Sequence, residues 1–564
     1  MSLMGALNLG SSALSVQQAA LQVTGNNIAN AGNADYTRQV ANVTSNPDEI
    51  TSSGQLIGTG ISLTSVQRQI NDALEARIRS STSDNSASTA NQQWLSQIEG
   101  TFNALGTTNI SSAMSTFFND WSHLANQPQD IAQRQVVIQD GISLTQQFND
   151  TSTQLTSIES QIDAQINSDA QNANNLAQKI ADLNGQIVVS QGSGDGHPND
   201  LMDQRDADLK QLSQLLNVNT VHQDNGAINV YVGSEPLVIG TQNQGIAVQT
   251  TSVNGKAVPS LVFKSNNGPV PATSGELGGL LATRAQAESI ISQTNTLAGN
   301  LIFELNKLHA SGQGISPITS TAGTNGVSDV NAALNTAGAG LKFQPVNGSF
   351  VVHVQNASGQ ETSTLVKVDL DGLNNNDTTL TSLAASLNAI TGVSATITGG
   401  KLTVAAANGA SGISFSQDSS GVLAALGINA FFSGSDASNI TVNTSLQTQP
   451  GLLAAAQNGD AADNTNALAI AALGSTPIAS MNGSSLDDSY QSIVNGIATQ
   501  VSDAKTSTQA SSAVLSALSA QHDSTSGVSL DEEAVNLMQQ QRAFQGAARL
   551  ITTIDQMMQT LINM

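Results

Sequence analysis

The first thirty residues carry a large apolar side chain at every seventh position. These positions are Leu7, Leu14, Leu21 and Ile28. An apolar repeat of seven residues forms one stripe along a helix, and such a stripe is typical of a coiled-coil seam. The opposite positions are polar but uncharged. The sequence therefore predicts an N-terminal helix whose apolar stripe packs against a second helix.

The last forty residues repeat this pattern. Their large apolar residues are Leu530, Leu537, Phe544, Ile551 and Met558. A second row is predicted to fill the neighbouring seam position, and it consists of Ala534, Gln541, Ala548 and Ile562. At 1.5 Å per residue, residues 530–558 would form a rod of roughly 43 Å. Both ends of the chain are therefore predicted to be seam helices that need a partner.

The start of the C-terminal helix is marked by its sequence. Ser529 is suited to cap the helix, and Asp531, Glu532 and Glu533 follow it in the first turn. Negative charge is favourable at this end because the helix dipole is positive there. We therefore predict that the helix begins at residue 530.

Between the two ends, helical and alternating patterns separate into tracts. Residues 85–190 and about 276–310 have apolar residues at helical spacing, which predicts long helices in a bundle. Residues 220–265 and 341–432 alternate β-branched and polar residues around Asn-Gly turns, which predicts antiparallel hairpins. One short helix is predicted near residues 380–390.

This order of tracts predicts an α+β multidomain fold. It consists of discontinuous coiled-coil-like terminal helices, a long helical-bundle trunk and a β-rich central insert. The terminal domain is predicted to comprise residues 1–68 and 520–564. The trunk comprises 69–315 and 436–519, with an embedded β segment near 220–265. The insert, 316–435, is expected to face outward because it is polar and lies farthest from both ends in sequence.

Composition narrows the possible partners. A chain of 564 residues exceeds a single hydrophobic core, so several domains are expected. A formal net charge of -24 repels phosphate backbones and anionic lipids, which argues against nucleic acid and membrane partners. The absence of cysteine excludes disulfides, thiolate metal sites and thiol catalysis. No long apolar run and no cleavable secretory signal are recognised, so a soluble protein is expected.

The sequence contains no convincing constellation of catalytic or metal-binding residues. The histidines are scattered and none has the spacing of a metal site; they are His123, His197, His222, His309, His353 and His522. Asp369, Asp371 and Asp377 suggest a calcium loop, but no glutamate closes the pattern, so a turn is expected. We expect no cofactor, no metal and no catalytic residue.

Two acidic segments allow more than one interpretation. Asp531, Glu532 and Glu533 fit helix-start charges better than catalytic carboxylates. Asp203 and Arg205 either pair with neighbours at a domain hinge or lie on a solvated helix face with local ion pairs, and the second interpretation is the simpler one.

The apolar stripes also allow alternatives: a core within one chain, a dimeric coiled coil or a polymer. Three features favour a polymer. The stripes lie at both extreme ends, their outer faces are almost uncharged, and no catalytic constellation lies between them.

Sequence motifs at both ends resemble those of a known family. Residues 24–30, Thr-Gly-Asn-Asn-Ile-Ala-Asn, are followed by Tyr-Thr-Arg-Gln at 36–39, and Ser526 begins the run Ser-Gly-Val-Ser-Leu-Asp-Glu-Glu near the other end. These motifs resemble the signatures of flagellar rod, hook and hook-associated axial proteins. The signature residues are Asn26, Asn27, Ile28, Ala29, Asn30, Tyr36, Arg38, Asp531, Glu532 and Glu533.

Middle segments are similar to the hook-associated members of that family, which lie at the hook-filament junction. These segments are 199–205, 278–284, 305–309 and 427–432. One departure concerns the turn before Tyr36, where the family usually has Pro-Gly and this chain has Ala34-Asp35. The tightness of that turn is expected to depend on the residues around it.

The resemblance implies a structural protein of the extracellular flagellum, exported by the flagellar type III apparatus without a cleaved signal. It also implies assembly with further copies in a ring or helix, with the hook protein and with hook-associated protein 3, and binding of an export chaperone at the C-terminal helix. Alternatives are another axial component such as the hook protein or a filament subunit, a surface adhesin, or an exported enzyme on a flagellar scaffold. The terminal helices are expected to be partly disordered before assembly, because an amphipathic helix gains most of its stability from packing.

Overall fold

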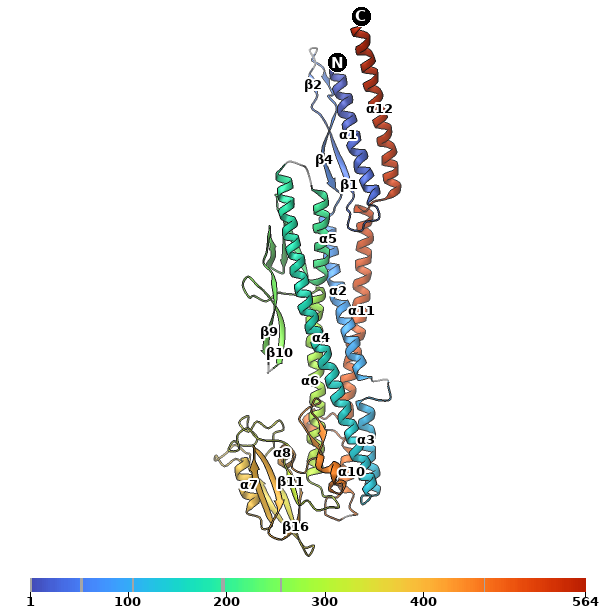
Figure 1. Ribbon diagram of the computed structural model, residues 1–564. Coiled ribbons are helices and arrows are strands. Elements are labelled where there is room, and N and C mark those ends of the chain that lie inside the picture. Colours follow the sequence, from blue (N-terminus) through green and yellow to red (C-terminus); the bar gives the residue numbers. More distant parts are fainter. Residues whose placement is uncertain are drawn as a thin grey trace. The chain divides into compact units, whose positions relative to one another are not determined.

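The computed structural model describes residues 3–50, 54–103, 106–193, 198–253, 256–460 and 462–563 (Figure 1). The chain forms two compact units. Unit 1 comprises Met1–Gln93, Gln161–Arg284 and Asp503–Met564, and unit 2 comprises Trp94–Ser160 and Ala285–Ser502. The helices that pass from one unit into the other are α2 (Asp72–Phe102), α4 (Ile131–Gly192), α6 (Gly275–Ala310) and α11 (Leu486–Ser526). The predicted division into three domains stays a prediction.

In unit 1 the two terminal helices pair with each other. Helix α1 (Leu3–Ala29) and helix α12 (Leu530–Ile562) run antiparallel, with the two chain ends at the same end of the pair (Figure 1). The residues that α1 buries recur every three or four positions, as a seam requires, and include Val16, Ala20 and Val23. Each terminal helix therefore already has one partner within its own chain.

The predicted second row of the C-terminal seam is wrong. The row that turns inward is Glu533, Ala547 and Ile554, with Gln540 half-buried between them. Ala534 and Gln541 are exposed, Ala548 is half-buried, and Ile562 is 79% exposed. The inward edge of α12 carries Glu533 and Gln540, which form hydrogen bonds with α1. A prediction from apolar periodicity alone does not take such polar contacts into account.

A β-hairpin follows α1 and packs against it. Strand β1 (Gln39–Ser45) pairs antiparallel with β4 (Ile61–Arg68), and β2 (Glu49–Ile50) pairs with β3 (Leu56–Ile57) nearer the tip. Gly60 has a φ of +112°, and a Cβ atom there would lie 2.8 Å from Ser12 Oγ on α1. Only glycine permits this close approach of hairpin and helix.

The remaining elements of unit 1 are helices and small antiparallel sheets. Helix α5 (Asn199–Leu215) precedes a four-stranded sheet in the order β5-β6-β7-β8 and a separate pair β9-β10. The strands are β5 (Val218–His222), β6 (Ile228–Val232), β7 (Glu235–Ile239), β8 (Gln242–Asn243), β9 (Ile246–Val253) and β10 (Lys256–Phe263). Buried Asn184 on α4 donates to the Ile228 and Gly240 carbonyls, each at 2.7 Å, and so fixes the sheet on the helix. The hairpins predicted for 220–265 are confirmed.

In unit 2, the insert contains two small antiparallel sheets. Their orders are β13-β12-β16 and β11-β15-β14. The strands are β11 (Ser320–Ala322), β12 (Gly348–Asn356), β13 (Glu361–Val368), β14 (Val393–Thr398), β15 (Lys401–Ala406) and β16 (Ala410–Ser416). The predicted short helix is α7 (Leu380–Asn388), which Thr379 caps at its start. The strand pattern and the helix predicted for this tract are confirmed.

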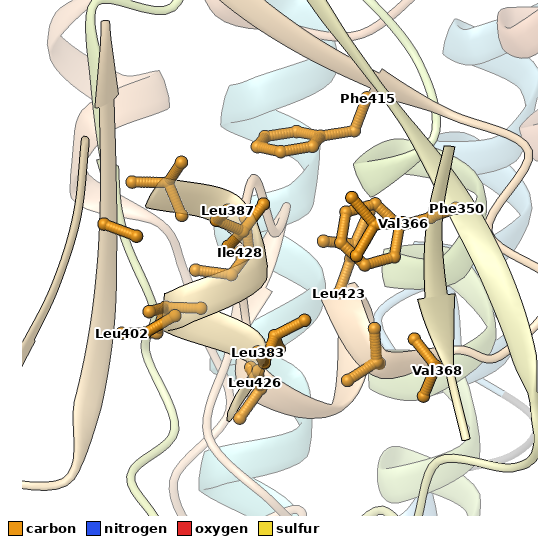
Figure 2. Packing of buried hydrophobic residues seen from close by; sticks show 14 of the residues in the cluster. Phe350, Val366, Val368, Leu383, Leu387, Leu402, Phe415, Leu423, Leu426 and Ile428 are labelled. Carbon is orange, nitrogen blue, oxygen red and sulfur yellow. The ribbon is translucent and has the colours of Figure 1, made fainter. Parts of the chain in front are cut away.

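A hydrophobic core lies between these sheets and helices (Figure 2). Phe350 and Phe415 from the first sheet, Leu383 from α7 and Leu426 from α8 (Val422–Leu426) point into it. The core extends to Ala310 and Phe303 of α6. The insert therefore completes its core with residues of the helical part of unit 2.

The rest of unit 2 consists of helices and short elements. They are α3 (Ile110–Asn126), β17 (Phe432–Ser433), β18 (Thr441–Val442), α9 (Thr444–Thr448), η1 (Pro450–Leu452), α10 (Thr465–Ala472) and η2 (Ala479–Met481). Aromatic rings of Phe117, Trp121, Phe431 and Phe432 pack together beside fully buried His309. The His309 ring nitrogens bond to the Asn429 carbonyl at 2.8 Å and the Ala454 N–H at 3.1 Å. Burial lowers the pKa of His309 to about 4, so the ring is neutral at pH 7.

Candidate assembly interface at the terminal helices

The N-terminal signature is organised around the buried side chain of Asn27. Its Nδ2 donates to the Gln39 carbonyl at 2.9 Å and to Glu533 Oε2 at 3.2 Å. Its Oδ1 accepts from the Tyr36 hydroxyl at 2.8 Å and from the Gln39 N–H at 3.0 Å. Since the amide group uses both donors and its acceptor, Asn27 fixes α1, the turn after it and α12 at one point.

Glu533 joins the C-terminal signature to the same cluster. Its side chain is 2% exposed, and its Oε1 accepts from Arg38 Nε at 2.8 Å. The Arg38 N–H donates to the Ser526 carbonyl at 3.0 Å. A buried carboxylate needs a charged or hydrogen-bonding partner. The partners of Glu533 are Arg38 and Asn27, and both come from the other end of the chain. The two signatures therefore form one site.

A second ionic cluster continues from this site to α5. Arg68 at the end of β4 donates to Asp203 at 2.9 Å and to Asp206 at 2.7 Å, and the Thr37 N–H donates to Asp203 at 3.4 Å. Burial raises the pKa of Asp203, with Arg68 opposing the shift. Burial, with Asp203 the next cause, raises the pKa of Tyr36 to about 12. These groups fix the base of the hairpin on α5.

The interpretation of Asp203 and Arg205 as a solvated helix face is wrong. Both are buried, and Arg205 donates to the Gly226 carbonyl at 2.7 Å and to Asn184 Oδ1 at 3.3 Å. Their partners come from β4, from α4 and from the turn between β5 and β6, elements that local sequence could not identify.

The turn with Ala34-Asp35 in place of Pro-Gly is closed by Asn33. The Tyr36 N–H donates to the Asn33 carbonyl at 3.2 Å, and the Asp35 N–H donates to Asn33 Oδ1 at 3.1 Å. An asparagine side chain that bonds to the backbone two residues later is a common turn former. The turn is therefore made without the proline and glycine.

Not every signature residue lies in this site. Asn26 and Ala29 are exposed on α1, Asn30 donates to the Asn26 carbonyl at 3.0 Å, and Asp531 and Glu532 lie on the surface of the first turn of α12. Ser529 caps α12 as predicted by accepting from the Glu532 N–H at 3.4 Å.

The predicted seam residues retain exposed surface. Most of them are half-buried: Leu7, Leu14, Leu21 and Ile28 on α1, and Leu537, Phe544, Ile551 and Met558 on α12. Leu530 is 56% exposed. A Cβ atom at Gly10 would lie 2.8 Å from Ile551 Cγ1, so the two helices are in close contact there. The helix pair therefore buries only part of its apolar stripe within one chain.

Sequence reasoning missed the polar positions of this helix pair. Thr24 Oγ1 donates to Gln540 Oε1 at 3.0 Å, about one turn along α1 and two turns along α12 from the Asn27–Glu533 contact. A polar residue inside an apolar repeat was the available signal, since such residues often fix the register of paired helices.

One hydrogen-bonded line in the insert has the residue types of a nucleophilic triad. His353 lies 2.7 Å from Ser416 Oγ on one side, and 2.7 Å from Glu361 Oε1 and 2.9 Å from Ser363 Oγ on the other. Ser416 is only 7% exposed, and the adjoining cavity of about 110 Å³ is lined by His353 and Glu361 but not by Ser416. A nucleophile must reach its substrate, so this line joins the three strands of the sheet and does not supply a catalytic site.

The acidic loop at Asp369, Asp371 and Asp377 forms a turn, as expected. Its carboxylate oxygens lie within 4.8 Å of one another. Asp371 accepts from the Leu373 N–H at 2.8 Å and Asp377 from the Gly372 N–H at 3.0 Å. Backbone bonding within the loop accounts for these side chains. Among the described residues, no helix is long and apolar enough to cross a membrane.

Comparison with known families matches three parts of the chain. The model of the flagellar hook-associated protein FlgK helical domain matches residues 95–325. The model of the flagellar basal body rod FlgEFG protein C-terminal region matches residues 519–564, and that of flagella basal body rod proteins matches residues 7–32. The last two matches contain α12 and most of α1.

Individual proteins are similar over almost the whole chain. Flagellar hook-associated protein 1 of Escherichia coli (strain K12) is 27% identical over 99% of both chains. Its namesake in Salmonella typhimurium is 26% identical, again over 99% of both, and the one in Bacillus subtilis is 27% identical over 98% of this chain and 96% of the relative.

A solved structure is similar in fold. It is the flagellar hook junction protein FlgK from Burkholderia pseudomallei, with a TM-score of 0.50 and 18% identity, over 80% of this chain and 100% of that chain. Together with the helical content and the small sheets, these similarities favour a flagellar structural protein over a surface adhesin or an exported enzyme. The chain is thus similar over nearly its whole length to flagellar hook-associated protein 1, and these similarities show a structural protein of the flagellar hook-associated kind.

Proposed function

We propose that this chain polymerises at the junction between hook and filament and connects the two, through α1 and α12. The observation that carries the proposal is the helix pair itself. It is fixed at one end by Asn27, Arg38 and Glu533, while its seam leucines, Phe544 and Met558 keep apolar surface exposed. Exposed apolar surface in a long stripe favours contact with a further subunit.

The proposed partners follow from this position. On each side the chain would contact further copies of itself, with the hook protein on one side and hook-associated protein 3 on the other. An export chaperone would bind α12, where exposed apolar residues are numerous: Leu530, Val535, Met538, Leu550, Met557, Leu561 and Ile562. Assembly would take place outside the cell, and export would proceed through the flagellar type III apparatus without a cleaved signal. The role is structural and not catalytic.

A double substitution tests the proposal. Leu537→Asp with Phe544→Asp places two charges in the apolar stripe, so incorporation into flagella should be lost. The measurement is swimming of a deletion strain that carries the variant, with electron microscopy of its hooks. Hooks without filaments are the expected result, and unchanged swimming would overturn the proposal.

A matched control separates assembly from folding. Val189→Asp with Val221→Asp places the same charges on exposed apolar residues outside the terminal helices, and swimming should persist. Leu537 and Phe544 are half-buried on the helix that pairs with α1, so circular dichroism of the purified variant should be measured and should show retained helix and a cooperative melt.

A further inference from the structure

The charges of the terminal helices are few and unevenly placed. Helix α1 contains no charged residue, and after its first turn α12 contains only Arg542, Arg549 and Asp555. Both arginines are exposed, and neither forms an ion pair within the described part of the chain. They lie seven residues apart, so they share one face of the helix at a spacing of roughly 10 Å. Two unpaired cations are notable in a chain with a net charge of -24.

The arginines lie on the side of α12 opposite the seam. Val535 is seven residues before Arg542, and Met538 lies one turn before it. Their exposed fractions are 48% and 51%. We call this set, Val535, Met538, Arg542 and Arg549, the outer stripe. It offers two apolar side chains followed by positive charge.

The tip of the hairpin presents the complementary groups. Ile50 and Leu56 are cross-strand partners in β2 and β3, and they are 70% and 66% exposed. Asp48 directly precedes β2, and its Oδ1 would lie 3.8 Å from a Cβ atom at Gly58, the residue directly after β3. Asp48 is exposed and forms no ion pair within the described residues. We call Asp48, Ile50 and Leu56 the tip patch: two apolar side chains beside one negative charge.

We propose that the tip patch of one copy docks on the outer stripe of a second copy, with Asp48 paired to Arg542 and the apolar residues in contact. The inference rests on the proposed function and names one of its contacts. The occupant is a second copy because the charges complement each other, each surface places two exposed apolar side chains beside its charge, and both surfaces belong to the same helix-and-hairpin region.

The two surfaces of a single copy cannot meet. The hairpin runs beside α1 with its β2 end toward the start of that helix (Figure 1), and Gly60 contacts Ser12 and Leu9. Arg542 lies near the level of Thr24, which contacts Gln540. From Ser12 to Thr24 is 12 residues, about 18 Å along the helix, and the tip extends farther still in the other direction.

The contact is therefore head-to-tail. Each copy offers its tip patch to one neighbour and its outer stripe to another, displaced along the helix axis by more than about 18 Å. Contacts of this kind propagate from copy to copy, in contrast to a symmetric contact that ends with a dimer.

Cysteine cross-linking tests the geometry, because the chain contains no cysteine of its own. Asp48→Cys with Arg542→Cys is introduced into the full-length protein, and flagella from the complemented deletion strain are oxidised. A disulfide requires Cα atoms within roughly 7 Å, so a bond within one chain is excluded. We expect a ladder of trimers and larger species on a non-reducing gel.

The single variants are the matched controls. One thiol per chain links two chains at most, so neither Asp48→Cys nor Arg542→Cys alone can give trimers. Asp48→Cys with Gln541→Cys moves the second thiol a quarter turn around α12, and the ladder should be lost. Dimers from Asp48→Cys alone without a ladder from the pair would show a symmetric contact and overturn the proposal, as would swimming cells whose double variant gives no cross-link.

A charge exchange supplies a second readout if the cysteines disturb assembly. Arg542→Glu should abolish or strongly reduce swimming, and adding Asp48→Arg should restore it. Normal swimming of the single variant, or no recovery in the exchanged pair, contradicts the contact. Either result leaves the proposed function intact when Leu537→Asp with Phe544→Asp still prevents filaments, so the two failures are distinguishable.

Discussion

The insert and the terminal helix pair bury their apolar residues in different ways. In the insert, Phe350, Phe415 and Leu426 are completely enclosed, and strands, helix α7 and the end of α6 all contribute to one core. In the helix pair, the predicted seam residues stay half-buried or exposed, and the positions that α12 buries are Glu533, Ala547 and Ile554, with polar Asn27 buried on α1.

This difference separates two roles that apolar residues have. An enclosed core of large side chains stabilises one chain, at about 1.5 to 3 kcal/mol for each fully buried residue. A half-buried stripe leaves part of that free energy for contact with another copy. Polar residues then fix the register of the two helices, which an apolar stripe alone specifies poorly.

The largest effect is expected in the insert core. Phe350→Ala should lower the free energy of unfolding by about 3 to 5 kcal/mol, because it leaves a cavity where the core cannot collapse. Denaturant unfolding of the purified protein measures the change. Leu365→Ala on the same sheet is 57% exposed in the wild type and should cost less than about 0.5 kcal/mol. Equal losses would remove the distinction between core and surface.

A smaller effect in unit 2 depends on pH. The pKa of His309 is about 4, below its usual 6.5, because the ring is buried. Between these two pKa values His309 is protonated in the unfolded chain but neutral in the folded chain. Its contribution to the free energy of unfolding is therefore complete above pH 6.5 and decreases by roughly 2 to 3 kcal/mol as the pH drops toward 4. His309→Gln should flatten this dependence in denaturant melts, whereas exposed His123→Gln should retain it.

In the helix pair, Glu533→Gln should cost about 1 to 3 kcal/mol, since Arg38 loses its buried counter-charge. Hydrogen exchange should show faster opening of α12 while the insert stays protected. Glu532→Gln is the control, because its side chain is 66% exposed and 3.5 Å from the same arginine. If both substitutions accelerate exchange equally, burial at Glu533 is not what fixes the pair.

The smallest effect concerns unit 1, where stability is expected to decrease, and not increase, as the pH rises. Burial raises the pKa of Asp169 to about 6, and Glu276 adds to the shift. The folded chain holds this proton more tightly than the unfolded one, so stability is greatest below pH 3.8 and is lost as the pH rises through 6. Asp169→Asn should therefore stabilise the protein at pH 7 by about 1 to 2 kcal/mol. No gain at pH 7, with exposed Asp182→Asn as the comparison, would contradict the assignment.

Local patterns predicted local structure well. The repeat at Leu530 and the cap at Ser529 correctly predicted helix α12, and the alternation in 341–432 correctly predicted hairpins around a short helix. These features depend on residues within a few positions of one another. The pattern also predicted that both terminal helices carry a stripe, because amphipathicity is a property of one segment.

Pairing across the chain was not predictable in the same way. The Asn27–Glu533 bond joins residues 506 positions apart, and the local sequence of either segment does not indicate which distant segment it contacts. The second seam row was placed on the wrong edge of α12 because periodicity treats Glu533 as polar and therefore outward. Asp203 was taken for a solvated residue for the same reason, although Arg68 makes its burial tolerable.

The bond between Asn27 and Glu533 also makes the packing of the N-terminal helix depend on a segment that is synthesised last. Residue 27 receives its last partner from a helix that begins at residue 530. A chain cut short by proteolysis or interrupted synthesis would lack that partner, so its N-terminal helix would keep only the hairpin and the turn before it as partners, however well the middle had folded. Only an intact copy can offer a finished end to its neighbours.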